Sequence, residues 1–248
     1  TLDFWVNSCY TSYIMIKLKE YMKSKGVKTF THQPVDELPK LLRENIDGKR
    51  YYISPTGEKY PSITTVLSKN NNEGIIAWRK KVGEAKANHI ASEAARRGTA
   101  VHKLIEDYLN NEELSDTSGV LPLALFTVMK EELDKIDNIQ IQEGSMYSDK
   151  YKVAGQVDCI AEYDGKLCVI DFKTSTREKK EEWVENYFIQ GTAYAEMYEE
   201  RYGKSIDDIL ILVVTEQGLN QVFHKKKQDY IPKLIEAIDN FNVDNNTQ

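Results

Sequence analysis

The 248 residues carry 33 Lys and Arg against 39 Asp and Glu, which gives a net charge of −6, and 41% of them are hydrophobic. With a mean hydropathy of −0.54, this composition excludes a largely disordered, collagenous or membrane-embedded chain. The acidic balance argues against a protein that coats nucleic acid by charge alone, but it allows an acidic metal site inside a locally basic groove. The three cysteines exclude a disulfide scaffold and a four-cysteine metal cluster, and they favour a reducing compartment.

The first 48 residues are predicted to form a separate, mainly helical extension of unknown role. An apolar stripe predicts a helix at residues 10–25, and a short helical run is expected around 41–46. Charged side chains among the first 25 residues leave no secretory signal, and no apolar run reaches the ~18 residues of a membrane span. Because the sequence begins at Thr1, a targeting segment removed from a longer chain stays an open alternative.

Residues 49–248 are predicted to form one α/β domain. The expected elements are, in chain order, a hairpin of 51–53 and 59–60, a helix through 66–67, helices at about 83–110 and 121–136, strands at 139–147, 153–163 and 166–174, a helix at about 181–201, strands at 209–215 and 219–225, and a helix at 230–241. The continuous apolar run at 209–215 favours a strand buried on both faces. The order of these elements predicts a mixed central β-sheet flanked by helices.

A two-residue turn is predicted at Asp164 and Gly165, because a type I′ turn requires positive φ at both central positions. Tyr163 should then pair with Lys166, and counting outward from this pair fixes the register of the whole hairpin.

In that register Asp158 lies opposite Asp171 and Gln156 lies opposite Lys173. Since side chains alternate along a strand, Asp158, Asp171 and Lys173 should project from one face of the sheet. The opposite face should receive the core residues Val157, Cys159, Ala161, Cys168, Ile170 and Phe172.

Two carboxylates opposite each other normally destabilise a sheet, by up to ~1 kcal/mol. Asp158 and Asp171 could be solvated acids on an exposed face. Asp171, however, lies within the otherwise apolar run 167–172. A buried pair of like charges persists when a divalent cation bridges it, so we favour a metal site, with Lys173 beside a bound phosphate.

Here the sequence resembles a known family. Residues 155–158 (Gly-Gln-Val-Asp) and 170–175 (Ile-Asp-Phe-Lys-Thr-Ser) resemble the core motif of the PD-(D/E)XK nucleases. The family's proline is replaced by Val157, which changes no ligand. The resemblance implies a restriction-endonuclease-like core and identifies residues 49–248 as the nuclease domain.

A second element, in residues 97–106, resembles the helical G-x-x-x-H-x-x-x-E element of the RecB-like branch. In that branch the histidine, here His102, reaches the metal. His102 and Glu106 are neighbours on one helix face. Gly98 lies in the middle of the helix, where close approach of another backbone would explain it. Taken alone, His102 could equally be a hydrogen-bonded core histidine.

A third element, residues 190–194, resembles the Q-x-x-x-Y element of the same branch. A buried amide at Gln190 needs hydrogen-bond partners, which nearby site groups or a DNA phosphate would supply. A core glutamine bonded to backbone is an equally good interpretation of the residue by itself. The buried stripe expected on this helix comprises Trp183, Tyr187, Gln190, Tyr194 and Met197.

Upstream, residues 60–67 and 78–81 resemble exonucleases of the mitochondrial genome-maintenance type and their phage-encoded relatives. Ser62, Thr64 and Thr65 at a helix N-terminus would make a phosphate cradle. Arg79 and the lysines after it would follow a DNA backbone, although such a run is more often a solvated face.

The resemblance implies a metal-dependent deoxyribonuclease. Asp158, Asp171, His102 and the main-chain carbonyl of Phe172 would hold Mg²⁺ or Mn²⁺, and Lys173 would position the attacking water and stabilise developing negative charge. Gln190, Tyr194 and Glu106 would orient the metal ligands or the phosphate backbone. Glu143 would contact a water or DNA.

The predicted activity is exonucleolytic, on single-stranded DNA or frayed ends, in replication, recombination or repair. A structure- or sequence-directed endonuclease and a catalytically idle DNA-binding module are the alternatives. The expected partner is DNA with a free end, and no contact with a membrane is expected. A helicase or a single-strand-binding protein would act together with the nuclease. The expected compartment is the cytoplasm of a bacterium or phage-infected cell, or the mitochondrion if a targeting segment was removed.

Overall fold

The computed structural model describes residues 16–17, 20, 26, 28–68, 72–115 and 119–246 of the chain. Most of the helix expected at residues 10–25 therefore lies outside the described residues. Within the described part of the chain, no helix is long and apolar enough to cross a membrane.

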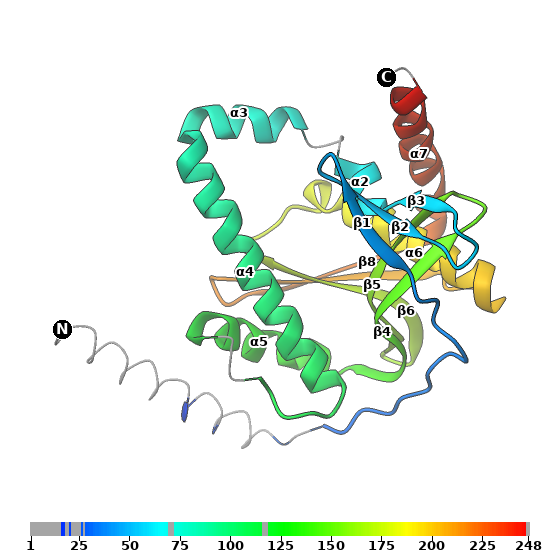
Figure 1. Cartoon of the computed structure of the whole chain (residues 1–248). Helices are drawn as coiled ribbons and strands as arrows, with labels where there is room; N and C mark the ends of the chain where they lie inside the picture. The colour runs from blue at the N-terminus through cyan, green and yellow to red at the C-terminus, as the bar shows by residue number, and fades with distance from the viewer. Residues whose placement is uncertain are drawn as a thin grey trace.

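A five-stranded mixed sheet forms the centre of the protein (Figure 1). Its strands lie side by side in chain order: β4 (Ile136–Ser148), β5 (Val153–Tyr163), β6 (Lys166–Ser175), β7 (Asp208–Thr215) and β8 (Asn220–Lys226). Neighbouring strands are antiparallel except β6 and β7, which are parallel and joined by the crossover helix α6 (Glu185–Tyr202). The predicted mixed sheet flanked by helices is confirmed.

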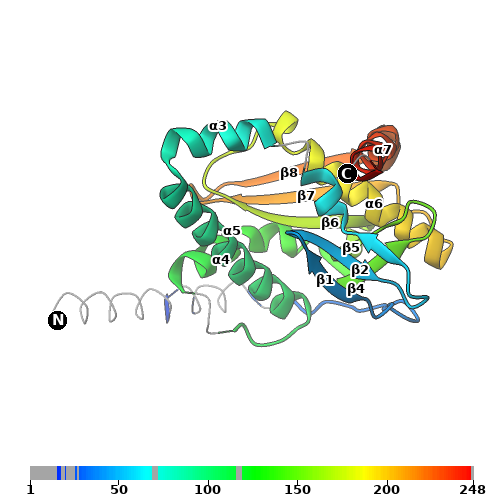
Figure 2. The same ribbon diagram turned by 45° about the horizontal axis from the view of Figure 1, so that its top comes forward.

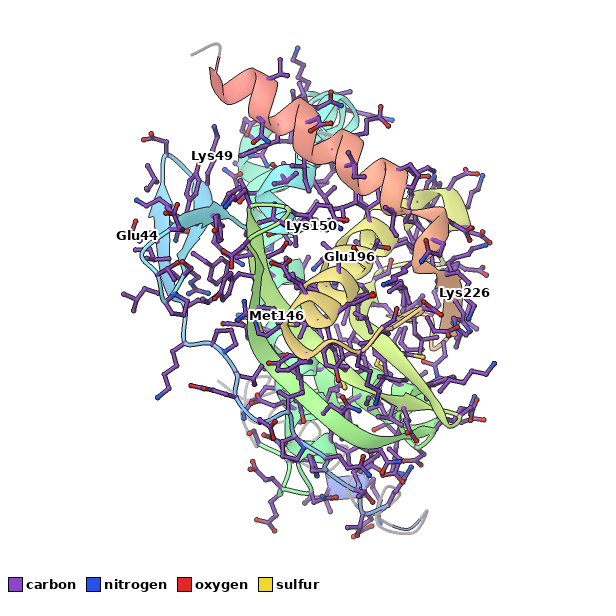
Figure 3. All side chains as sticks on the ribbon, turned by 90° about the vertical axis from the view of Figure 1, so that its right-hand side faces the viewer. Glu44, Lys49, Met146, Lys150, Glu196 and Lys226 are labelled. Carbon is purple, nitrogen blue, oxygen red and sulfur yellow. The ribbon has the colours of Figure 1, made fainter. Side chains whose placement is uncertain are left out.

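Helices cover both faces of this sheet (Figures 1 and 2). On one face lie α4 (Glu84–Leu109) and α5 (Val120–Leu133), and on the other α2 (Ile63–Leu67), α6 and α7 (Ile231–Asn246). All eight residues of β7 are buried because both its faces are covered, as its apolar run predicts. Figure 3 shows α7 lying across α6, and Lys150 beside Glu196 on α6, with 3.6 Å between Nζ and Oε2.

A second, three-stranded sheet packs against the far end of the β4–β5 hairpin. It consists of β1 (Leu42–Ile46), β2 (Lys49–Ile53) and β3 (Lys59–Pro61). The hairpin of β2 and β3 is confirmed, but the helical run expected around 41–46 is wrong. Leu42 is 71% exposed and Ile46 39% exposed, so their apolar side chains form no buried helical stripe, and β1 pairs with β2 instead. The boundary at residues 48/49 falls in the turn of this pair, and the division into two domains stays a prediction.

Other helix boundaries differ from expectation at three places. The helix α3 (Asn72–Val82) was not predicted, because its apolar side chains form no buried face: Ile75, Ile76 and Trp78 are 48%, 50% and 37% exposed. The helix α5 ends at Leu133, where β4 soon begins. Residues 181–183 form a separate turn, η3 (Glu181–Trp183), before α6 starts.

Candidate active site

The β5–β6 hairpin sets the geometry of the site. Asp164 and Gly165 occupy its turn with φ of 48° and 75°, and Tyr163 pairs with Lys166 as predicted. The pairing continues in the predicted register as far as Cys159 and Ile170.

Beyond Cys159 and Ile170 the two strands separate. The Phe172 N–H donates to Asp158 Oδ2 at 2.9 Å, so this carboxylate takes an amide that a further strand pair would have used. The described strand pairs of β5 and β6 end at Cys159 and Ile170, so the predicted pairs of Asp158 with Asp171 and of Gln156 with Lys173 are both wrong. Asp158 and Asp171 therefore flank the opening between the strands. Val157 also departs from expectation, because it packs in the core on the α6 side, away from Cys159.

Three side chains from three elements converge at this opening. His102 comes from α4, Glu143 from β4 and Asp158 from β5, and one ligand atom of each lies within 4.8 Å of the others. The distance from His102 Nδ1 is 3.7 Å to Glu143 Oε1 and 3.8 Å to Asp158 Oδ2. Such spacings suit one divalent cation, whose bonds to oxygen are about 2.0–2.6 Å long.

The hydrogen bond of His102 fixes which of its ring atoms faces the acids. Nε2 lies 2.8 Å from the carbonyl oxygen of Phe172, and since a carbonyl only accepts, Nε2 carries a hydrogen. Nδ1 is left facing Glu143 and Asp158, where a neutral imidazole would present a lone pair to two carboxylates. Burial lowers the pKa of His102, but Glu143 and Asp158 outweigh it and raise the pKa to about 9. A proton or a cation at Nδ1 satisfies this arrangement.

Asp171 lies deeper, 3% exposed, on the face of β6 that α6 covers. Its Oδ2 is 2.5 Å from Lys173 Nζ, but neither carboxylate oxygen accepts a well-directed hydrogen bond. Burial raises the pKa of Asp171 to about 6; Lys173 opposes this rise and Asp158 adds to it. Burial also acts to lower the pKa of Lys173, yet Asp171 and Asp158 hold it above its usual value.

These observations fit a divalent cation. Three carboxylates, those of Glu143, Asp158 and Asp171, gather here, and Lys173 is the one lysine described as pairing with any of them. Partly buried acids held together in this way are costly unless further positive charge compensates them. His102, Glu143 and Asp158 have the spacing to hold the ion, and Asp171, beside Asp158 but outside that group of three, stays a predicted ligand. The carbonyl of Phe172 accepts from His102, and its predicted role as a ligand stays a prediction.

Glu143 is held in an unusual backbone conformation. Its φ is 48°, inside a strand, where non-glycine residues rarely have positive φ. Such residues cost of order 1–3 kcal/mol and persist where the surrounding structure fixes them, commonly at functional sites. Gln156 donates to Glu143 Oε2 at 2.7 Å and orients the carboxylate. The sequence suggested only a loose role for Glu143, because the four-residue loop between β4 and β5 gives no turn signal that fixes their register.

Helix α6 closes the site from the opposite side. Tyr187 lies against Lys173, with Nζ 5.1 Å from the ring centroid. Gln190 is half-buried and donates to the Tyr194 hydroxyl at 3.2 Å. Tyr194 packs directly on Gly155, where a Cβ would come within 2.8 Å of the tyrosine ring and hydroxyl. Of the predicted stripe, Trp183 is not buried: it is 45% exposed.

Two residues of the predicted helical element do not behave as expected. Glu106 pairs with Lys103, one turn away, at 3.2 Å, and no described contact joins it to His102. Gly98 is not forced by a neighbouring backbone, because the nearest atom to a Cβ there would be Thr174 Oγ1 at 3.8 Å. The same element contributes a residue that the sequence did not single out, Arg97, which is ion-paired with Glu216.

The predicted phosphate cradle is largely occupied by internal hydrogen bonds. Ser62 caps α2 by accepting from the Thr65 N–H at 3.1 Å, and the Thr65 hydroxyl accepts from the Arg50 N–H at 3.0 Å. Thr64 is exposed. Arg79 binds Glu84 and Asn88 and so ties α3 to α4. A structural role thus accounts for Ser62, Thr65 and Arg79, and their predicted contacts with DNA stay predictions.

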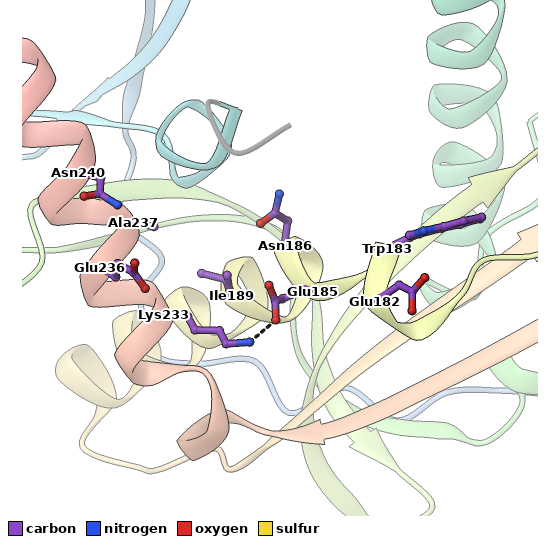
Figure 4. A pocket seen from close by; sticks show the side chains of 9 residues that line it. All are labelled: Glu182, Trp183, Glu185, Asn186, Ile189, Lys233, Glu236, Ala237 and Asn240. Atoms are coloured by element: carbon purple, nitrogen blue, oxygen red, sulfur yellow. Dashed lines mark hydrogen bonds and ion pairs between the residues drawn. The ribbon is translucent and has the colours of Figure 1, made fainter. Parts of the chain in front are cut away.

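The cavity at the start of α6 and the neighbouring face of α7, of about 580 Å³, is separate from this acidic cluster (Figure 4). Glu182, Glu185 and Glu236 line it, together with Lys233, which is ion-paired with Glu185. None of the four residues that could hold a cation borders this cavity. The acidic cluster instead lies at the opening between two strands.

Comparison with known proteins agrees with this fold. The family model of the PD-(D/E)XK nuclease superfamily matches residues 120–244, about half of the sequence, and the chain belongs to this superfamily. The match begins after α4 and so does not include His102.

The chain is also similar to mitochondrial genome maintenance exonuclease 1. The mouse protein is 28% identical over 172 residues and the human protein 26% identical over 173 residues. Each alignment covers 64% of this chain and 50% of the relative, so the chain spans about half the length of these curated relatives. A solved structure from Eubacterium rectale, provisionally described as an exonuclease, is 14% identical with a TM-score of 0.40 and covers 60% of this chain and 65% of its own.

Proposed function

We propose that this chain is a divalent-metal-dependent DNA exonuclease. The observation that carries the proposal is the convergence of His102, Glu143 and Asp158 beside the buried Asp171–Lys173 pair. The motif residues of a nuclease family thus meet at one point, although they come from separate strands and a helix. PD-(D/E)XK nucleases generally use divalent metals, and we propose Mg²⁺ or Mn²⁺ here.

Each residue has a role that follows from its position. Asp158, Asp171, His102 and Glu143 would hold the cation, which when bound lowers the pKa of a water and neutralises phosphate charge. Lys173 keeps its proton and places a positive charge where negative charge develops on the phosphate. Gln156 orients Glu143 through the hydrogen bond to Oε2. Phe172 orients both Asp158, through its N–H, and His102, through its carbonyl.

Single-stranded DNA with a free end is the proposed substrate. The support is the name of the curated relatives, which are exonucleases that maintain a genome. A helicase or a single-strand-binding protein would supply such ends during replication, recombination or repair. We place the reaction in a reducing compartment, a cytoplasm or a mitochondrion, since Cys159 and Cys168 are buried free thiols.

The test compares linear and circular single-stranded DNA of equal length, each internally labelled, with Mg²⁺, with Mn²⁺ and with a chelator. We expect mononucleotides or short products from the linear DNA only, and none in chelator. Cleavage of the circular DNA at a similar rate would show that the protein is an endonuclease and not an exonuclease. Binding of DNA without cleavage under every condition would show that it is a DNA-binding module without nuclease activity. Asp158→Asn serves as the inactive control and Glu44→Gln, an exposed acid on β1, as the active one.

A further inference from the structure

The segment that leaves the active-site strand is firmly anchored. Gln221 of β8 accepts from the Lys179 N–H at 2.7 Å and donates to the Lys179 carbonyl at 2.8 Å. The Ser175 hydroxyl donates to the Arg177 carbonyl at 2.6 Å. Residues 175–179 are thereby held in a defined path that begins two residues after Lys173. Side chains on this segment have fixed positions relative to the acidic cluster.

This segment carries two cationic side chains without a described ion pair. Among the described residues, neither Arg177 nor Lys179 pairs with a carboxylate, although the exposed Glu178 lies between them in the sequence, whereas Lys225 on β8 pairs with Glu181. Burial, and then the charge of Arg177, lower the pKa of Lys179. Two cations without an acidic partner can bind an anion such as a phosphate.

A partly exposed tryptophan lies next to Arg177 of this segment and to Lys180, the residue after it. Trp183 is 45% exposed, and the Arg177 guanidinium carbon and Lys180 Nζ lie 5.7 and 5.5 Å from the centroid of its ring. Figure 4 shows the side chain of Trp183 extending from η3 toward α4. An exposed indole is costly to leave in water and suits stacking against the flat face of a nucleobase.

The two sides of Trp183 differ in charge. The 580 Å³ cavity at the start of α6 has Glu182, Glu185 and Glu236 in its lining, and its Lys233 is already paired with Glu185. That side repels phosphate. Arg177 and Lys179 carry free charge, so a DNA backbone would pass Trp183 on the side of these cations.

We propose that Trp183, Arg177 and Lys179 form a nucleotide-binding subsite for single-stranded DNA, in which a base stacks on Trp183 and flanking phosphates bind the two cations. This inference rests on the proposed nuclease function and names a contact outside the metal cluster. Arg177 follows Lys173 by four residues, at most about 14 Å of chain. At 3.4 Å per stacked nucleotide, the Arg177 backbone lies within about four nucleotides of Lys173, and the base on Trp183 lies further along the strand.

Binding of fluorescent dT12 to the full-length protein in chelator tests the subsite without cleavage. Trp183→Ala should weaken binding about tenfold, the scale of one stacked base, and Trp183→Phe should recover most of it. With a twelve-unit abasic strand, Trp183→Ala should change the affinity less than twofold. The double variant Arg177→Ala, Lys179→Ala should weaken both strands and lower the slope of log affinity against log salt by about 1.4, at 0.7 per phosphate.

Lys233→Ala is the matched control, since it removes a cation from the acidic side of Trp183 and should leave affinity unchanged. The substitutions fall at four positions whose side chains are exposed or half-buried, so melting temperatures should stay close to wild type. Wild-type affinity in Trp183→Ala, an equal loss on the abasic strand, or a larger effect of Lys233→Ala would overturn the subsite. If the wild-type protein cleaves DNA while these variants bind normally, the subsite alone fails. If the variants lose binding but the wild type never cleaves, the nuclease function alone fails.

Discussion

Two hairpins in this protein have the same dipeptide in their turns, but their strands differ in burial. Asp47-Gly48 joins β1 to β2, and Asp164-Gly165 joins β5 to β6. The Asp φ values are 50° and 48° and both Gly φ values are 75°, so the two turns have nearly the same backbone. In each, the flanking residues form the first strand pair.

The difference lies in what covers the strands. The acid of the first hairpin, Glu44, is 42% exposed and pairs with Lys59 at 2.8 Å, where water and salt screen it. In the second hairpin helices cover both faces, and Asp171 is buried with Lys173 as its one described ion-pair partner. The turn sets the register in both cases. Burial is what makes the acids of the second hairpin costly without further positive charge.

The largest expected effect comes from removing a charge at the buried hairpin. Asp171→Asn should lower single-turnover cleavage by about 10³-fold and weaken Mn²⁺ binding, because a preorganised charge at the site is lost. Glu44→Gln, on the exposed hairpin, should change neither. Calorimetric titration with Mn²⁺ and single-turnover assays measure both properties. Unchanged Mn²⁺ affinity in Asp171→Asn would show that this carboxylate is not a ligand.

A second contrast concerns the lysine that pairs with the acid of each hairpin, Lys173 with Asp171 and Lys59 of β3 with Glu44. Lys173→Met should retain binding of Mg²⁺ and single-stranded DNA but cleave about 10²-fold more slowly, since methionine keeps the stem and removes the charge. Lys59→Met, which removes the exposed partner of Glu44, should cleave like wild type. Single-turnover rates in saturating Mg²⁺ decide this. If metal restored the rate of Lys173→Met, Lys173 would be only a counter-ion to the acids.

The sequence predicted the central sheet well because its signals are local. The Asp164-Gly165 turn predicted the pairing correctly from Tyr163 with Lys166 to Cys159 with Ile170, and Asp158 and Asp171 are the residues just beyond this last pair. The same dipeptide at 47–48 predicts a hairpin just as well, but a short apolar run at 41–46 was interpreted as helix. An Asp-Gly turn is therefore stronger evidence for a hairpin than a few apolar residues are for a helix, when nothing shows that those residues would be buried.

What the sequence could not predict depends on packing between distant elements. The separation of β5 from β6 arises when the Asp158 carboxylate takes the Phe172 amide, which no periodicity reveals. Glu143 itself has a positive φ, and this break in the regular backbone of β4 places its carboxylate beside His102. The sequence predicts Trp183 in a buried helical stripe, but α6 begins two residues after it. Trp183 is therefore not part of α6 and does not lie on the buried face of that helix.

A smaller effect should appear in the pH dependence of stability without metal. The pKa of His102 rises from 6.5 unfolded to about 9 folded, so the folded protein binds this proton more tightly. Its contribution is full below pH 6.5 and is lost as pH rises through about 9, and is on the order of 2 kcal/mol. Urea unfolding in chelator at pH 6 and pH 9.5 should show this loss in wild type. In His102→Gln the difference between the two pH values should shrink, while a core histidine without acidic neighbours would give no such change.

The smallest expected effect compares the two turns themselves. Alanine at φ 75° costs about 1–2 kcal/mol, partly offset by about 0.4–1 kcal/mol from the reduced freedom of the unfolded chain. Gly165→Ala should therefore lower the melting temperature by about 2–4 °C, because β5 and β6 unfold only with the whole core. Gly48→Ala carries the same local strain, but β1 is an exposed edge strand that can open alone, so the global melting temperature should fall less than half as far. Hydrogen exchange should instead accelerate at 42–53 in this variant. Equal melting shifts for both would mean that the small sheet unfolds with the core, and that burial is not what separates the two hairpins.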